Sequence, residues 1–395
     1  MRKKSTIDDI ARLAGVSRTT ISRVLNHKPD VDPATRERIM RIIEEQNFVP
    51  STTASGLARG HSRLIGMLIP AWAWWIISDI APGIIEYIKQ TPYELVLYSI
   101  NDEDIERDRS EVINRLLATQ LTAGLLAIYP DRASQHLTRL YKQGFPVVII
   151  DDQEAQVTPW VGVDNTSGAY TAVRHLIGLG HRRIAHILGP AEYLVSQDRY
   201  NGYRQALLEG GIEPDPELVV EGDFLPQSGR AGAEKLFKLA PERRPTAIFA
   251  SSDQMAYGVL AAAEEYGLSV PRDIAVVGFD DDAPSAHTRP ALTTIRQPYF
   301  EMGRCGIELL LSMLDTAGGA INLAPTRTGG AINPAPTRGG SLSLQEAGKG
   351  TNGGMTSSDA RPVRIQLPTS LIVRESCGAT NQSPISASYG KSFLY

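Results

Sequence analysis

The segment "VSRTTISRVLN", residues 16–26, carries two arginines and four small hydroxyl side chains on a stretch expected to be helical. Its apolar residues, Val16, Ile21, Val24 and Leu25, form one thin stripe at helical spacing. The first turn of a helix attracts phosphate through its free N–H groups, and an arginine can donate two hydrogen bonds to a guanine edge. A solvated surface helix would show the same residues, so the segment alone leaves both interpretations open.

The neighbouring sequence predicts two more helices, one on either side. Thr6 is a suitable N-cap for a helix that Gly15 ends, and Ser17 is a suitable N-cap for the helix of the opening segment. A third helix begins within "VDPATRERIMRIIEEQ", with Asp32 as N-cap and Pro33 at the first helical position. Two helices joined by a tight glycine turn are typical of the helix-turn-helix motif, whose second helix enters the major groove of DNA.

Charge is distributed unevenly along the chain. Residues 1–60 hold eleven Lys and Arg against seven Asp and Glu, a net charge of +4. The whole chain carries −4, so residues 61–395 carry −8. A basic N-terminal part on an acidic remainder is expected when only the N-terminal part meets a polyanion.

Beyond residue 63, strands alternate with amphipathic helices. A helix is predicted over 299–315, and "VRIQLPTSLIVRE" at 363–375 has strand-like alternation. This order predicts an α/β fold with doubly wound parallel sheets, in two blocks that divide near residue 160. The predicted strands of these two blocks lie near residues 64–70, 93–99, 124–129, 146–150, 183–189, 246–250 and 273–279.

Residues 316–361 differ in composition from the rest of the chain. They are rich in Gly, Ala, Thr, Ser and Pro, and contain the near-repeats "GGAINLAPTR" and "GGAINPAPTR". Few of these residues could join a hydrophobic core, so a flexible low-complexity insertion is predicted. The polar tail over 379–395 is expected to be frayed.

Several classes of protein find no support in the sequence. There is no run of 18 apolar residues for a transmembrane helix, and the basic N-terminus lacks the apolar stretch of a secretory signal, so a cytoplasmic location is expected. Cys305 and Cys377 give neither a metal-binding spacing nor a disulfide framework. Phosphate-binding-loop, nucleophile-elbow and zinc-protease motifs are missing. We therefore expect no enzyme, no cofactor and no metal.

Seven motifs follow one another along the chain. They are "TIDDIARLAGVSRTTISRVLN", "VDPATRERI", "GHRRIAHILGP", "RYNGYRQAL", "SSDQMAYGVL", "DIAVVGFDD" and "LTTIRQP". In this order they resemble the lactose-repressor (LacI/GalR) family of bacterial transcription regulators, over about residues 5–315 and 362–378. The resemblance implies a helix-turn-helix head, a hinge helix and a two-subdomain body like that of periplasmic sugar-binding proteins. It further implies a dimer whose affinity for operator DNA changes when a small effector binds in the cleft of the body.

The resemblance implies DNA contacts for specific residues. Arg18 and Thr19 fall at the two variable positions that the family uses to contact bases, and Arg23 lies one turn further on. Leu57 falls where the family inserts a leucine into the minor groove at the centre of a near-palindromic operator. A surface charge or a phosphate contact is the alternative for the arginines, and packing on the body is the alternative for Leu57. The complete expected set is Ser17, Arg18, Thr19, Thr20, Ser22, Arg23, Asn26 and Leu57.

The resemblance also implies an effector site. Arg199 matches the family arginine that holds effector oxygens, and Asp280 matches an effector-binding aspartate, with a structural salt bridge as the alternative for both. Tryptophans in "PAWAWWIISD" at 70–79 could stack on a sugar face or a purine, or pack in the core or at a dimer interface. The complete expected set is Trp72, Trp74, Trp75, Asp151, Arg199, Phe224, Ser252, Asp280 and Gln297.

The expected protein is thus a dimeric, sequence-specific repressor under the control of a small effector, most simply a sugar. A purine, a nucleoside or a protein co-regulator is the alternative effector. A sugar-binding protein without regulatory DNA contact is the alternative function. The expected domains are a helix-turn-helix domain at 1–49, a hinge at 50–62, a first subdomain at 63–162 and 292–315, a second subdomain at 163–291 and 362–378, the insertion at 316–361 and the tail at 379–395.

Overall fold

The computed structural model describes residues 6–25, 28–46, 48, 62–100, 121–129, 134–151, 157–191, 193–317 and 362–379, without the side chains of Ala71, Trp72 and Ile100. Contacts divide the chain into a smaller unit, which holds the N-terminal helices, and a larger unit, which holds two β-sheets. We call the helical part of the smaller unit, residues 6–48, the N-terminal domain, and the described residues within 64–379 the C-terminal domain. Asn26, Leu57 and nearly all of the expected hinge lie outside the described residues.

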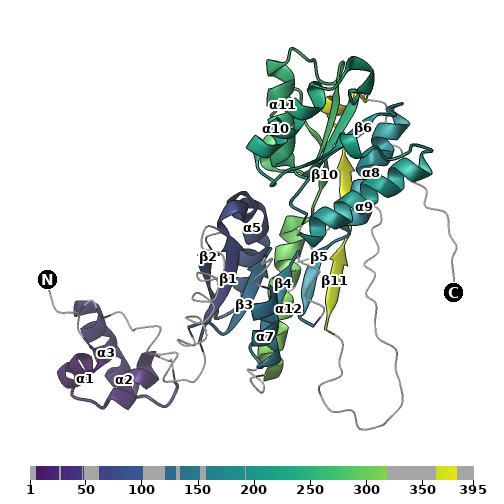
Figure 1. Cartoon of the computed structure of the whole chain (residues 1–395). Coiled ribbons are helices and arrows are strands. Elements are labelled where there is room, and N and C mark those ends of the chain that lie inside the picture. Colours follow the sequence, from purple (N-terminus) through teal and green to yellow (C-terminus); the bar gives the residue numbers. More distant parts are fainter. Residues whose placement is uncertain are drawn as a thin grey trace, which may run out of the picture. The chain divides into compact units, whose positions relative to one another are not determined.

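Three helices form the N-terminal domain: α1 (Ile7–Ala14), α2 (Arg18–Leu25) and α3 (Pro33–Glu45) (Figure 1). Thr6 and Asp9 cap α1 reciprocally in a capping box. The hydroxyl of Ser17 accepts a hydrogen bond from the backbone N–H of Thr20 at 3.1 Å, which caps α2. Asp32 accepts one from Thr35 at 2.9 Å, which caps α3. The three predicted helix starts are therefore confirmed.

Packing of the three helices explains the thin apolar stripe of the opening segment. The buried core is small and consists of Ile10, Ala11, Ala14, Ile21, Val24, Val31 and Ile39. The helix α2 contributes only Ile21 and Val24 to it as buried residues. Gly15 ends α1 in the left-handed conformation, with φ of 63°, which glycine adopts without steric cost. The chain therefore turns sharply and leaves one side of α2 outside the core.

The C-terminal domain contains two six-stranded sheets, which confirms the predicted α/β fold class. The first sheet has the order β11-β5-β4-β3-β1-β2 and the second the order β12-β10-β9-β8-β6-β7. The pairs β1–β3, β3–β4 and β6–β8 run parallel, and β12 joins β10 antiparallel. The strands are β1 (Leu64–Pro70), β2 (Glu94–Ile100), β3 (Gly124–Ile128), β4 (Val147–Ile150), β5 (Trp160–Val163), β6 (Ile184–Leu188), β7 (Val219–Glu221), β8 (Ala247–Ala250), β9 (Ala275–Asp280), β10 (Thr293–Arg296), β11 (Arg364–Leu367) and β12 (Ser370–Ile372).

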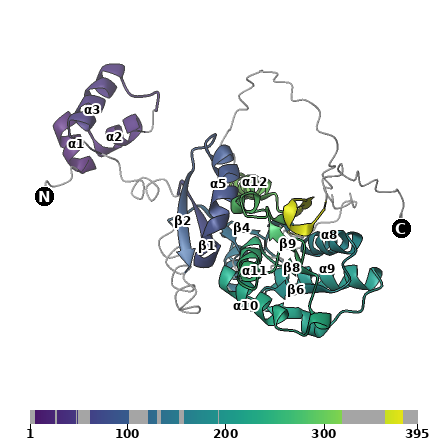
Figure 2. The ribbon, with the colours of Figure 1, turned by 90° about the horizontal axis from the view of Figure 1, so that it is seen from above.

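Helices cover the sheets in pairs. In the second subdomain, α8 and α9 lie on one face of the sheet and α10 and α11 on the other (Figure 2). In the first subdomain, α12 packs over β3, β4 and β5 and against α5. The α-helices of this domain are α5 (Ile77–Ile88), α7 (Ser134–Lys142), α8 (Asn165–Gly178), α9 (Leu194–Glu209), α10 (Pro226–Phe237), α11 (Asp253–Glu265) and α12 (Tyr299–Ala317); the 3₁₀ helices are η1 (Ala71–Ile76), η3 (Pro216–Leu218), η4 (Pro241–Arg243), η5 (Ala283–Ala286) and η6 (Glu375–Cys377).

The chain passes from one subdomain to the other at different points than expected. The predicted first subdomain included residues 292–296, but β10 pairs with β9 in the second sheet. The predicted second subdomain included 362–367, but β11 pairs with β5 in the first sheet. The predictions were wrong at these two strands: the crossover was placed before β10, which pairs with the strand preceding it, and β11 pairs with a strand far away in sequence. In addition, α12 continues through Thr316 and Ala317, while 318–361 and 380–395 lie outside the described residues.

Within the described part of the chain, no helix has both the length and the apolar character needed to span a membrane.

Candidate functional site

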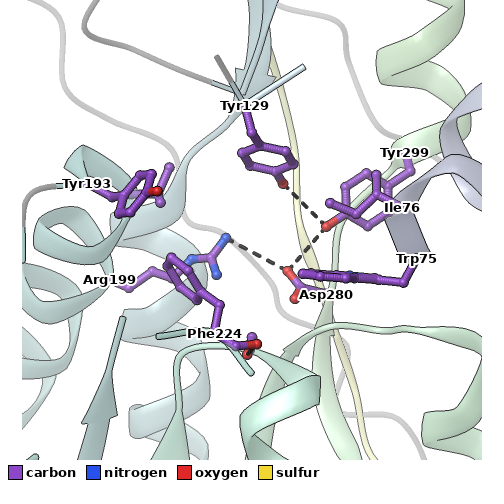
Figure 3. Close-up of a pocket in the computed structure, with 10 residues that line it drawn as sticks. Trp75, Ile76, Tyr129, Tyr193, Arg199, Phe224, Asp280 and Tyr299 are labelled. Carbon is purple, nitrogen blue, oxygen red and sulfur yellow. Dashed lines mark hydrogen bonds and ion pairs between the residues drawn. The ribbon is translucent and has the colours of Figure 1, made fainter. Parts of the chain in front are cut away.

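A pocket with about 360 Å³ of empty space lies at the carboxyl ends of strands from both sheets. Parallel α/β sheets commonly bind ligands at this end of their strands. Figure 3 shows how the lining side chains converge. They are Trp75, Ile76, Tyr129, Tyr193, Val195, Arg199, Phe224, Ser252, Asp280 and Tyr299.

Arg199, on α9, is the buried cation of the pocket. Its side chain is 3% exposed, and its guanidinium carbon lies 3.8 Å from the centre of the Phe279 ring. Nε donates a hydrogen bond to Oδ1 of Asn165 at 2.8 Å, and Nη1 donates one to the backbone carbonyl of Ser251. Nη2 lies 3.8 Å from Oδ1 of Asp280. The guanidinium is therefore held in one orientation from three sides, with its Nη2 edge towards the aspartate.

Asp280, the last residue of β9, is the opposing carboxylate. Its Oδ1 accepts hydrogen bonds from Nε2 of Gln297 at 2.8 Å and from the hydroxyl of Tyr299 at 3.2 Å. Burial raises the pKa of Asp280 to about 6, and the charge of Arg199 opposes that rise. The hydroxyl of Tyr299 also lies 3.4 Å from that of Tyr129 (Figure 3). A polar relay thus runs from Arg199 through Asp280 to two tyrosine hydroxyls.

Unusual backbone conformations occur at the same pocket. Among the described residues, the non-glycine residues with positive φ are Tyr129, Asp151, Phe224, Asp280 and Asp281. Tyr129, Phe224 and Asp280 line the pocket, and Asp281 follows Asp280 directly. Left-handed backbone at such residues costs about 1–3 kcal/mol each and clusters at functional sites. The strained residues of the described chain therefore gather at this pocket and beside it, which makes it the candidate functional site.

Two further buried carboxyl groups lie close to the relay. Asp151, at the end of β4, is 1% exposed, and burial raises its pKa against the opposing effects of Tyr129 and Arg199. Asp282 is 3% exposed, and burial together with the charge of Asp280 raises its pKa to about 8. The surroundings of the pocket therefore hold more carboxyl groups than cations. No group of three or more potential metal ligands occurs among the residues that the structure describes.

The structure brings most of the expected effector residues together. Trp75, Arg199, Phe224, Ser252 and Asp280 line the pocket. Gln297 contacts it through Asp280, and Asp151 is buried beside Tyr129 and Arg199. Trp74 does not line the pocket and is 49% exposed, because consecutive residues of η1 face different directions. The side chain of Trp72 lies outside the described part of the chain.

Ser252 has a structural task as well. Its hydroxyl accepts a hydrogen bond from the backbone N–H of Met255 at 3.1 Å and so caps α11. Asp253, the first residue of α11, is a fully buried acceptor for the hydroxyls of Ser285 and Thr294, both at 2.6 Å. Sequence reasoning missed Tyr129, Tyr193 and Tyr299 among others; an aromatic residue next to the end of a strand or the start of a helix was the available signal.

The described polar face of α2 forms the second candidate surface. Ser17, Arg18, Thr19 and Arg23 are exposed, and Thr20 and Ser22 are partly exposed. Nε of Arg18 lies 2.9 Å from Oδ1 of Asp8, and Nη1 of Arg23 lies 3.2 Å from Oδ2 of Asp30. Arg36 donates to the carbonyls of Val24 and Lys28, and so holds the end of α2 rather than standing free. The surface exposes hydroxyl, N–H and guanidinium groups on one short helix, which suits a phosphate backbone and base edges.

Comparison with known proteins finds matches for both domains of the chain. Residues 6–51 match the family described as bacterial regulatory proteins, lacI family, and residues 173–329 match a periplasmic binding protein-like domain. Catabolite control protein A of Priestia megaterium is 33% identical over 326 residues, which is 82% of this chain and 97% of that protein. The chain therefore belongs to the lacI family of bacterial regulatory proteins.

Solved structures resemble the chain along nearly its whole length. A Lac repressor dimer bound to operator and the anti-inducer ONPF has a TM-score of 0.75 and 26% identity, with 95% of this chain and 100% of that chain covered. A complex of the transcriptional regulator CelR with cellobiose has a TM-score of 0.64 and 30% identity, with 94% and 99% covered. These proteins are regulators that bind DNA or small ligands, and the relatives are not enzymes.

Proposed function

We propose that this chain is a dimeric repressor whose affinity for operator DNA is set by a small effector in the pocket. The observation that carries the proposal is the buried Arg199–Asp280 relay, which lies among aromatic rings where residues from both subdomains meet. A ligand that contacts both subdomains favours the conformation in which they are close. If that conformation changes the spacing of the N-terminal domains in a dimer, effector and operator affinities are coupled.

A sugar is the effector class that the pocket supports best. Rings of Trp75, Tyr193 and Phe224 offer flat apolar faces for a pyranose ring, while Arg199 and Asp280 offer a donor and an acceptor for its hydroxyls. The similar regulator CelR is known in complex with cellobiose, which supports a carbohydrate here too. The same rings could stack on a purine, so nucleobases and nucleosides form the alternative class.

For the DNA-binding part, Ser17 and Thr20 are proposed to contact phosphates and Arg18 and Thr19 to contact bases. Ser22, Arg23, Asn26 and the wedge residue Leu57 complete the proposed interface with a near-palindromic operator. The chain is proposed to act in the cytoplasm, without a cofactor, and as no enzyme. The similarity to a Lac repressor dimer on its operator supports the dimer and the DNA partner.

A ligand screen tests the effector half of the proposal. The melting temperature of the full chain is measured against monosaccharides, cellobiose and other disaccharides, sugar phosphates, polyols, nucleobases and nucleosides. A ligand at a hundred times its dissociation constant adds about 2.7 kcal/mol to the stability of the folded state. Tyr299→Phe, which removes a hydroxyl of the pocket, should weaken binding of the hit.

Tyr257→Phe is the matched control, because the hydroxyl of Tyr257 bonds Ser285 at 2.8 Å and does not line the pocket. A nucleobase hit would replace the sugar class and leave the site in place. The hit is then added to the chain bound to DNA selected from a random duplex library. A confirmed ligand that leaves DNA affinity unchanged would contradict the regulatory mechanism, and a chain that binds the ligand but selects no DNA would be a binding protein alone.

A further inference from the structure

The two exposed arginines of α2 are paired with aspartates in different ways. Asp8 approaches Arg18 through the inner nitrogen, Nε, at 2.9 Å. Asp30 approaches Arg23 through a terminal nitrogen, Nη1, at 3.2 Å. In the first pair the closest contact thus lies at the inner side of the guanidinium and not at its terminal edge, which carries Nη1 and Nη2. The second arrangement occupies that edge.

Asp8 is held in place by the fold of the domain. It lies in the first turn of α1, where the helix dipole favours a carboxylate. The capping box between Thr6 and Asp9 fixes the start of that helix. Buried Ile10 of α1 packs with Ile21 of α2 in the same small core, so the two helices keep a fixed relation. The carboxylate of Asp8 therefore stands at a defined place beside the first residue of α2.

We propose that Asp8 is a positioning and specificity-determining residue: it orients Arg18 so that the terminal edge of the guanidinium contacts a guanine in the operator. A free arginine side chain loses much rotamer freedom when it is fixed on a base, and a partner that fixes it beforehand reduces that loss. A guanine offers two neighbouring acceptors, O6 and N7, to such an edge in the major groove. The other three bases do not present two neighbouring acceptors there.

The negative charge of Asp8 has a second consequence. The phosphate backbone dominates sequence-independent affinity, and an aspartate beside it is repelled. Asp8 thus weakens binding to arbitrary DNA while it favours the one base contact that Arg18 makes. Arg23 is different, because its terminal edge must leave Asp30 before it can contact a base or a phosphate.

This inference rests on the proposed DNA binding, and the experiment keeps the two separate. The full chain first selects binding sites from a random duplex library. Affinities of the wild type, Asp8→Asn, Asp8→Glu and Arg18→Lys are then measured on the selected site and on variants with each base pair replaced in turn, at several salt concentrations. Arg18→Lys identifies the base pair that Arg18 recognises, because lysine lacks the two-pronged edge.

Glu37→Gln is the matched control. It removes one negative charge from the exposed face of α3, and Glu37 forms no ion pair in the part of the chain that the structure describes. Asp8→Asn and Glu37→Gln should both strengthen binding to arbitrary DNA, most clearly at low salt.

Only Asp8→Asn should reduce discrimination at the base pair of Arg18, by up to about fivefold, which corresponds to the upper end of the range for an exposed ion pair. Asp8→Glu should retain more of the discrimination than Asp8→Asn. In an Arg18→Lys background, Asp8→Asn should change nothing further at that base pair.

Two outcomes would overturn the inference. If the affinities of Asp8→Asn across the base-pair variants coincide with those of Glu37→Gln, the inference is overturned and the proposed DNA binding stands. A wild-type chain that selects no site overturns both.

Discussion

Two ion pairs of this chain, each between an arginine and an aspartate, differ in how deeply they are buried. Arg199 and Asp280 lie 3.8 Å apart with side chains 3% and 6% exposed. Arg18 and Asp8 lie only 2.9 Å apart, but their side chains are 68% and 55% exposed. Water and salt screen the exposed pair, so the shorter distance corresponds to the smaller contribution to stability.

The difference agrees with what each region is proposed to do. A pocket that selects a small ligand needs donors and acceptors fixed before binding, and Arg199 has further partners in Asn165 and Ser251. The exposed pair of Arg18 and Asp8 is proposed to orient one side chain for a partner outside the chain, and it contributes little to the stability of its own domain. The buried pair therefore contributes to both the fold and the pocket, and the exposed pair contributes mainly to the orientation of Arg18.

Arg199→Met should have the largest effect on stability. It leaves Asp280 buried without its cation, and it removes the hydrogen bonds to Asn165 and to the carbonyl of Ser251. Breaking a buried pair in this way costs about 3–5 kcal/mol. Urea unfolding of the full chain measures the change in the free energy of unfolding. Arg18→Met is the paired control and should cost less than about 1 kcal/mol; equal losses would refute the comparison.

Asp282→Asn should change how the stability of the C-terminal domain depends on pH. Burial and the charge of Asp280 raise the pKa of Asp282 to about 8 in the folded chain, against an ordinary value of 3.8. Between these two values the folded state binds more protons than the unfolded state, so this group makes stability fall as pH rises, by up to about 1.4 kcal/mol per pH unit. Asparagine cannot ionise, so the variant should show a flatter profile and be more stable than wild type at pH 8.

The pH prediction has a control with the opposite shift. Asp273 is exposed, and its hydrogen bond with Arg272 lowers its pKa below the ordinary value. Its folded pKa lies below the ordinary value of 3.8, so it is ionised in both states well above that value, and Asp273→Asn should leave the slope between about pH 5 and 8 unchanged. Urea unfolding at half-unit steps from pH 4 to 8.5 compares the three proteins. Parallel profiles for wild type and Asp282→Asn would show that Asp282 is already ionised when folded.

Local signals predicted the N-terminal domain and much of the alternation of the C-terminal domain. The starts of α1, α2 and α3 are set by Thr6, Ser17 and Asp32, each of which bonds a backbone N–H three residues further on. The strands β5 and β7 were missed because runs of four and three residues are too short to show a period. The strand β10 stays in the sheet of the preceding strand β9, so the crossover was placed one strand too early, whereas β11 pairs with β5, which lies far away in sequence and which no local pattern encodes.

The pocket was predictable to the extent that its residues belong to motifs. Arg199 and Asp280 stand in "RYNGYRQAL" and "DIAVVGFDD", and the structure places them together. Tyr129 and Tyr299 follow or begin ordinary elements, where a tyrosine packs in a core just as often. Trp74 and Trp75 are neighbours in sequence, and only the turn of η1 decides that Trp75 lines the pocket and Trp74 does not.

Thr6→Ala should have a smaller effect on stability than Arg199→Met, and it extends the comparison to the N-terminal domain. Thr6 accepts a hydrogen bond from the N–H of Asp9 at 3.3 Å, and its own N–H donates to Asp9 at 3.0 Å. Loss of such a cap costs about 1 kcal/mol. Hydrogen exchange of the amides of α1 in the full chain measures the change, and Thr6→Ser should retain most of the protection. Because the Thr6 hydroxyl is uncharged, the loss should persist at high salt, unlike that of an exposed ion pair. If salt removed the difference between Thr6→Ala and wild type, the domain would be held by its surface charges rather than by its caps.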